Sequence, residues 1–165
     1  MWSQPLLTVV LAFACLLPLV VAEPYNITIY DESPTITYLP SRSGDSTTTW
    51  NSSYTISGTY NNQSGQMGLG ESYHYTTADG ASASLGFVGT AIYVWGNNYG
   101  NESDVQLQVG GQDLERGQVE GLLGWKDGLK NQWWEFTVNI TSGRSAWDGF
   151  DLRRITVTVD FGGKG

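Results

Sequence analysis

The chain has 165 residues, a formal net charge of −8 at pH 7 and only 15% charged residues. Such an acidic protein lacks the basic surface that neutralises nucleic-acid phosphates or binds anionic membranes, so we expect neither partner. With 21 glycines, 7 tryptophans and 9 tyrosines, the composition favours an aromatic, turn-rich, all-β protein over a helical or disordered one. The length suits a single domain.

The N-terminus has the pattern of a secretory signal peptide. Leu6–Val21 is almost wholly apolar, and small residues precede a cleavage site after Ala22. We therefore predict a signal peptide over residues 1–22 and a single β-sandwich domain over residues 23–165. The alternative is a membrane anchor, but the run is short for a span of about 20 residues and Pro18 interrupts it. The prediction is a secreted, extracellular protein with no membrane span after cleavage.

Period-two alternation of apolar and polar residues predicts short strands along the rest of the chain. The predicted strands cover residues 25–30, 35–39, 50–56, 73–77, 81–87, 91–95, 105–109, 135–140 and 154–159. Residues 57–72, rich in Gly, are interpreted as a mobile loop, and Asp79-Gly80 as a hairpin turn between its flanking strands. Only residues 113–123 have helical spacing.

The same alternation predicts which side chains form the core. Ile27 and Ile29 of the first strand should point inward. Between two sheets we expect Leu85, Phe87, Val105, Leu107, Val109, Phe136, Val138, Ile155, Val157 and Val159. Short strands at this spacing indicate an all-β fold, a β-sandwich or jelly roll.

Five Asn-x-Ser/Thr sequons fit a secreted glycoprotein. They lie at Asn26, Asn51, Asn62, Asn101 and Asn139. Asn26 and Asn139 alternate with apolar neighbours, so both should lie on the solvent face of a strand.

Residues able to perform catalysis or bind metals are few. The only cysteine is Cys15, inside the predicted signal, and the only histidine is His74, which excludes thiol catalysis and conventional zinc sites. No Gly-x-Ser-x-Gly motif accompanies His74, so we predict a structural histidine and no catalytic residue. The oxygen-rich stretch Asn97–Asp104 lacks the regular Asp spacing of a calcium loop. We predict no metal site and no cofactor.

Two central motifs resemble a known family. Ser72-Tyr-His-Tyr-Thr76 and Gly80–Gly96, together with the opening Asp31–Tyr38, are similar to secreted or membrane-anchored proteins of mushroom-forming fungi. The resemblance implies an N-terminal jelly roll of galactose-binding-like type. The chain differs from this family at Asn131–Glu135 and at Arg153-Arg154, and it lacks the Ser/Thr-rich stalk and membrane helix.

The aromatic residues suggest a ligand site. Sugars stack their C–H faces on Trp and Tyr while amide side chains bind the hydroxyl groups. The loop that follows a predicted strand provides both kinds of group, and a turn provides another Trp; the candidate residues are Trp95, Asn97, Asn98, Tyr99 and Trp147. The alternative is that most Trp are core residues. In the pair Trp133-Trp134, which straddles both sheet faces, one side chain should point outward.

Three functions remain open. The favoured one is a non-catalytic binding module for glycans or cell-wall polysaccharide. The second is a structural or cell-surface ectodomain, truncated before a stalk and membrane helix, that contacts other proteins. The third is a glycosidase or esterase, because 16 Asp and Glu residues make an acidic pair available in any fold.

Overall fold

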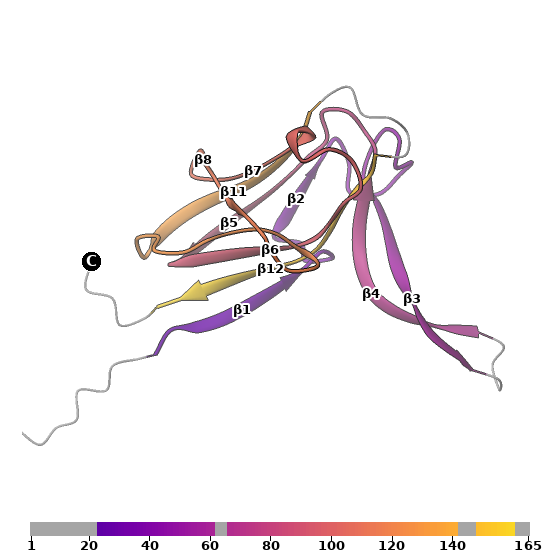
Figure 1. Cartoon of the computed structure of the whole chain (residues 1–165), viewed down its shortest axis with the longest axis horizontal. Helices are drawn as coiled ribbons and strands as arrows, with labels where there is room; N and C mark the ends of the chain where they lie inside the picture. The colour runs from indigo at the N-terminus through magenta and orange to yellow at the C-terminus, as the bar shows by residue number, and fades with distance from the viewer. Residues whose placement is uncertain (1–22, 62–65, 142–147, 161–165) are drawn as a thin grey trace, which may run out of the picture.

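In the computed structural model, residues 23–61, 66–141 and 148–160 are described, and they form two antiparallel β-sheets (Figure 1). The large sheet contains β1 (Tyr25–Tyr30), β3 (Asn51–Asn61), β4 (Gln66–Thr76), β6 (Ala91–Asn98), β9 (Glu115–Arg116), β10 (Leu122–Lys126) and β12 (Phe150–Val159). The small sheet contains β2 (Ile36–Leu39), β5 (Ser82–Gly89), β7 (Val105–Val109), β8 (Gln112–Asp113) and β11 (Gln132–Ile140). A short 3-10 helix, η1 (Glu102–Asp104), precedes β7.

The predicted fold class, an all-β sandwich of jelly-roll type, is confirmed. Strand neighbours come from distant parts of the chain: the large sheet has the order β3-β4-β12-β6-β10-β9, and the small sheet β2-β5-β11-β7-β8. The predicted signal peptide, the sequon at Asn62 and the candidate Trp147 lie outside the described residues.

The core lies between the inner faces of the two sheets, and all ten predicted core residues are buried. Alternation along each strand produces this arrangement, because successive side chains point to opposite faces. Trp50 is fully buried beside Phe150, and its indole N–H lies 3.1 Å from the carbonyl oxygens of both Leu39 and Ser82. The Trp50 side chain therefore links β2 to β5, and its indole N–H has hydrogen-bond acceptors although the residue is buried.

Strand β12 changes its neighbour halfway along one edge. Phe150–Leu152 pairs with the end of β4, whereas Arg154–Val159 pairs with β1. A register shift against β6 falls between Leu152 and Arg154. Figure 1 shows the result: β3 and β4 leave the sandwich as a two-stranded ribbon, while β1 continues along the edge of β12.

The predicted loop at residues 57–72 is wrong over its described parts. Residues 57–61 extend β3 and residues 66–72 begin β4, and the two strands pair from Asn51↔Tyr75 to Asn61↔Gln66, with register shifts that absorb the irregular spacing. Gly70 lies so close to Thr55 that a Cβ would come within 2.3 Å of the Thr55 hydroxyl oxygen. The glycine there permits close strand packing, which the sequence pattern cannot distinguish from a loop.

Three further expectations are corrected. Asp79-Gly80 is a turn, with Gly80 at φ 72°, but it passes from the large sheet to the small one, so β4 and β5 do not pair. Ile27 is 39% exposed because β1 is an edge strand, whereas Ile29 packs against the core. Residues 113–123 form the end of β8, the short β9, turns and the start of β10 instead of a helix. Within the described residues, no helix is long and apolar enough to span a membrane.

Candidate functional site

The outer face of the large sheet carries the polar and aromatic side chains that the core excludes. On β4, Tyr73 and Tyr75 point outward because the alternate residue His74 is buried. On β12, Asp151 lies on the outer side before the register shift and both Arg153 and Arg154 follow it. A bulge lets two consecutive side chains leave the same face of a sheet, which regular alternation forbids.

Asp151 organises this face although it is completely buried. Its Oδ1 accepts hydrogen bonds from the Asn97 backbone N–H at 2.8 Å and from Arg153 Nε at 3.2 Å. Its Oδ2 accepts the Tyr99 hydroxyl at 2.8 Å and Asn97 Nδ2 at 3.1 Å. The carboxylate is therefore satisfied by groups that cover it from solvent, and it fixes the orientation of the side chains around it.

Tyr99 has one end fixed and one face free. Its hydroxyl is tied to Asp151, yet 56% of the residue is exposed, and its ring meets Tyr75 edge to face with centroids 6.3 Å apart. Partial burial, the hydrogen bond to Asp151 and the charge of that carboxylate together raise the pKa of Tyr99 above its ordinary value. The phenol is therefore neutral at physiological pH and presents a positioned aromatic surface.

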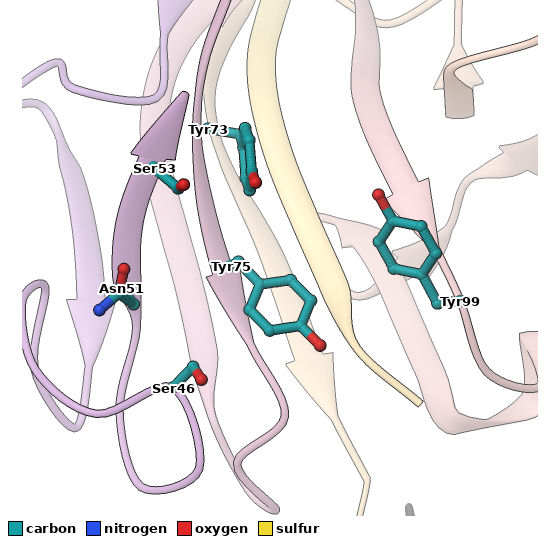
Figure 2. Close-up of a pocket in the computed structure, with 6 residues that line it drawn as sticks. All are labelled: Ser46, Asn51, Ser53, Tyr73, Tyr75 and Tyr99. Atoms are coloured by element: carbon teal, nitrogen blue, oxygen red, sulfur yellow. The ribbon is translucent and has the colours of Figure 1, made fainter. Parts of the chain in front are cut away.

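These aromatic rings border a pocket of about 340 Å³ (Figure 2). The pocket crosses from β3 over β4 and β12 to the loop after β6; its lining residues are Ser46, Asn51, Ser53, Tyr73, Tyr75 and Tyr99. Three rings and three neutral polar side chains form the walls. The volume lies at the lower end of the range for small-molecule sites.

Gly149 supports one wall of the pocket. A Cβ added at Gly149 would lie 2.1 Å from the Tyr75 ring, so the ring rests directly on this backbone. The Gly149 carbonyl also accepts the Tyr99 backbone N–H at 2.8 Å. A single backbone segment thereby sets the relative positions of the two tyrosines.

A second hollow of about 320 Å³ lies on the same face; it is lined by Glu71, Trp95, Asn97, Glu120, Gly121, Arg153 and Arg154. The Arg154 guanidinium stacks over the Trp95 ring, 4.7 Å from its centroid. Arg154 also bonds Glu71 at 2.6 Å, and Glu71 lies 3.7 Å from Arg153. The hydrogen bond between Asn97 and the Tyr99 hydroxyl joins this hollow to the tyrosine pocket.

The structure brings some of the predicted site residues together. Asn97 and Tyr99 meet at Asp151, and Trp95 contributes to the second hollow, half-buried beneath Arg154. Asn98 is used within its own loop, where its amide nitrogen donates to the Asn101 carbonyl and its amide oxygen accepts the Gly100 N–H.

Sequence reasoning missed Tyr73, Tyr75 and Asp151. The tyrosines flank His74, and the outward direction of that pair follows once the histidine is placed inside. Asp151 stands between Phe150 and Leu152 in a strand. A carboxylate in such a place requires partners when it is buried, which is the one signal that the sequence offered.

His74 is buried in a separate cluster on the inner side of the sheet. Its Nδ1 lies 2.7 Å from Oδ2 of the fully buried Asp31, and its ring stacks on Tyr38 at 4.5 Å. The Ser72 hydroxyl bonds the other Asp31 oxygen at 2.5 Å, and the Tyr38 hydroxyl donates to the Asp31 carbonyl. The acid thus stands between serine and histidine, whereas a catalytic triad needs the histidine in the middle.

The described sequons differ in their surroundings. Asn26, Asn51 and Asn101 are exposed, and Asn139 is half-buried with its neighbours Val138 and Ile140 inside. Asn51 lines the tyrosine pocket, and its amide nitrogen donates to the Gly44 carbonyl at 2.8 Å. No three His, Cys, Asp or Glu side chains gather as a metal site in the part of the chain that the structure describes.

Comparisons with known proteins give little. No family model matches the chain, and no curated protein matches it. Among solved structures, the chain is similar to a family two carbohydrate esterase from Cellvibrio japonicus, with a TM-score of 0.48 and 10% sequence identity. The match covers 83% of this chain and 34% of that one, so the chain spans about a third of the esterase's length. An identity of 10% is too low to transfer a function.

Proposed function

We propose that the chain is a non-catalytic carbohydrate-binding module and that the tyrosine pocket is its ligand site. The observation that carries the proposal is the pocket itself: three tyrosine rings and three neutral polar side chains around about 340 Å³. Such walls offer stacking for the C–H face of a sugar and hydrogen bonds for its hydroxyl groups. The ligand class is a mono- or oligosaccharide.

The charges around the pocket favour a neutral sugar over an acidic one. Arg153 and Arg154 lie nearby, but Glu71 contacts both and the buried Asp151 neutralises Arg153 further. Glu120 adds a further acidic group to the adjoining hollow. A carboxylated or sulfated ligand would find no unpaired cation among these described residues and would face like charge.

The environments of the chemistry-bearing side chains support a non-catalytic role. His74 and Asp31 are buried away from both hollows. Asp151 is completely buried and already accepts hydrogen bonds on both oxygens. A glycosidase needs two carboxyl groups that reach the scissile bond from both sides. Asp151 is covered, and Glu71 in the adjoining hollow is paired with Arg153 and Arg154, so the described lining of the two hollows offers Glu120 alone.

A glycan array probed with the full chain, followed by calorimetry on each hit, tests the proposal. Tyr75→Ala and Tyr99→Ala should each weaken binding at least tenfold, because each removes one stacking wall. Tyr25→Ala is the matched control, since Tyr25 is exposed at the far end of β1. Equal affinity in all four proteins would contradict the proposed site, and hydrolysis of chromogenic glycosides by the parent would contradict the non-catalytic role.

We also propose that the protein is secreted after cleavage behind Ala22, which rests on the apolar run and small residues described above. N-terminal sequencing of protein recovered from the medium of a eukaryotic host tests this. The expected first residue is Glu23. Recovery of the intact N-terminus in the membrane fraction would favour an anchor.

A second candidate function, protein contact, is favoured by the β3–β4 ribbon. Ile56 is 68% exposed and Leu69 73% exposed, and they are direct cross-strand partners beyond the sandwich. Paired exposed apolar residues on a projecting ribbon are suited to self-association. Light scattering of the full chain would show a dimer that Ile56→Ser and Leu69→Ser convert to monomer, whereas a monomeric parent would contradict this candidate.

A further inference from the structure

The outer face of the small sheet carries one large exposed aromatic ring. Trp133, on β11, is 64% exposed, as expected for one member of the Trp133-Trp134 pair. It lies over Gly86 on β5: a Cβ added there would lie 3.2–3.4 Å from three atoms of the indole ring. Val88, the direct cross-strand partner of Trp133, is 50% exposed beside it. The indole therefore has one side against the sheet and the other toward solvent.

Neutral hydrogen-bonding side chains continue from this ring along the strands. The row comprises Ser82, Ser84, Gln106, Gln108, Thr137 and Asn139, all on the same outer face by strand register. Charge on this face comes from Glu135 of β11 and from Asp113 of the adjoining β8, whose carboxylate accepts hydrogen bonds from the Gln108 amide at 2.9 Å and the Gln106 amide at 3.5 Å. From Trp133 to Asn139 the row spans about 20 Å at the usual rise of a strand.

We propose that this face is a second carbohydrate-binding surface, for an extended, uncharged polysaccharide chain. A flat indole with a free side stacks on the C–H face of a sugar ring, and hydroxyl and amide groups at regular spacing suit successive hydroxyls of a polymer. Charge argues against anionic polymers, because the row offers no cation among its described residues and the whole chain carries −8. The exposed apolar side chains are Trp133, Val88 and, at the opposite end of the face, Leu39, so no continuous apolar stripe is present among the described residues to dock an amphipathic helix.

This surface is independent of the tyrosine pocket, because the two lie on opposite outer faces of the sandwich. Two sites on one rigid module hold two sugar chains at once, which increases avidity on a polymer surface without any new contact. The sequon at Asn139 lies within the row. A glycan at Asn139 would cover the polar end of the surface, so binding is strongest when Asn139 is unmodified.

The test is retention of the full chain on three insoluble probes: cellulose, chitin and β-1,3-glucan. All proteins carry Asn139→Gln to remove the glycan. The parent should be retained on at least one probe, and Trp133→Ala should weaken that retention at least tenfold. Val119→Ala is the matched control, because Val119 is also exposed but lies in a loop. Tyr99→Ala removes one wall of the tyrosine pocket only, so this variant should still be retained on the probe through Trp133.

Two outcomes would overturn the proposal: no retention of the Asn139→Gln protein on any probe, or equal retention of the Trp133→Ala variant. If Trp133→Ala does not fold, two other measurements test the proposal: retention of Trp133→Phe, and acrylamide quenching of indole fluorescence in the parent. We expect Trp133→Phe to bind with intermediate strength. We also expect soluble oligosaccharides of the retained polymer to shield indole fluorescence from acrylamide, and quenching unchanged by these sugars would contradict the proposal.

Discussion

Two completely buried aspartates, Asp31 and Asp151, lie on opposite sides of the large sheet and serve different purposes. Asp31 is bonded by Ser72 and His74 from the inner face, so its partners belong to the core. Asp151 is bonded by Asn97, Tyr99 and Arg153 from the outer face; Tyr99 lines the tyrosine pocket, and the other two line the adjoining hollow. The same chemistry, a carboxylate that accepts hydrogen bonds on both oxygens, ties core residues together in one place and orients the proposed binding surface in the other.

Arg153 connects the two aspartates. Its backbone carbonyl accepts the Asp31 N–H at 2.9 Å, and its side chain donates to Asp151. It stands where β12 exchanges β4 for β1 as its neighbour. Burial alone therefore does not distinguish a structural acid from a functional one. The two are distinguished by the face of the sheet on which their hydrogen-bond donors lie. Five predictions test this, from the largest expected effect on stability to the smallest.

Asp31→Ala should have the largest effect. Removing this buried carboxylate leaves the His74 ring nitrogen and the Ser72 hydroxyl without their partner, at a cost of about 1–3 kcal/mol of unfolding free energy for each group. Urea unfolding followed by tryptophan fluorescence measures this loss. A cost below about 1 kcal/mol would show that the Asp31 cluster is dispensable to the fold.

Asp151→Ala should destabilise less and abolish binding. The loss of a buried acceptor costs about 1–3 kcal/mol, but its donors Tyr99 and Arg153 are partly exposed and can turn to water. The protein should remain folded while affinity for any sugar identified on the array drops at least tenfold. Sugar affinity equal to that of the parent would show that Asp151 does not orient the sugar-binding side chains.

Alkaline pH should weaken the Asp31 cluster and the Asp151 cluster to different extents, because each contains a tyrosine. The pKa of Tyr38 is raised chiefly by burial and next by the charge of Asp31. The pKa of Tyr99 is also raised, chiefly by its partial burial. A raised pKa means that the fold favours the neutral phenol, so this stabilisation is complete below about pH 10, the value in the unfolded chain, and is lost as pH rises further. Tyr38→Phe should flatten the alkaline loss of stability more than Tyr99→Phe, as urea melts between pH 8 and 12 would show.

Gly149→Ala should alter the site and spare the core. The added methyl group would meet the outer end of the Tyr75 ring, which can rotate away, so the change in stability should stay below about 1 kcal/mol. Displacement of that ring should nevertheless weaken sugar binding several-fold. Calorimetry and a urea melt on the same sample separate the two effects, and Gly111→Ala is unsuitable as a control because its φ is 75°. Val119→Ala, an exposed residue outside both proposed binding surfaces, is the control.

A glycan at Asn51 should block the pocket without changing stability. Asn51 is exposed and lines the pocket, so a sugar on its amide nitrogen would occupy the ligand's place. Protein from a glycosylating host should bind free ligand weakly, and Asn51→Gln should restore binding. Mass spectrometry of the Asn51 peptide establishes occupancy; equal binding at full occupancy would place the ligand elsewhere.

The sequence predicted the core because alternation is a local property: every residue from Leu85 to Val159 that it placed inside is buried. It also grouped Asn97 and Tyr99, because they lie two residues apart at the end of β6 and in the loop that follows. It could not predict Tyr75 as their neighbour, because that contact depends on β4 pairing with β12 across most of the chain. Tyr75 lies in a predicted strand, but the erroneous loop at 57–72 hid the full length of β4 and its pairing with β3, since glycine marks close packing and loops alike.

The exchange of neighbours along β12 has a consequence for local opening. Only Phe150–Leu152 attaches the ribbon to β12 within the described strands, and most of β3 and β4 have only each other as partners. Amide hydrogens near the ribbon's tip should therefore exchange with solvent long before those of β6 or β11. The tyrosine pocket spans this attachment, with Tyr75 on the ribbon side and Tyr99 on the sandwich side. A ligand held between the two rings would also contact the base of both ribbon strands, so occupancy of the site would be recorded as slower amide exchange in β3 and β4, including residues beyond those that line the pocket.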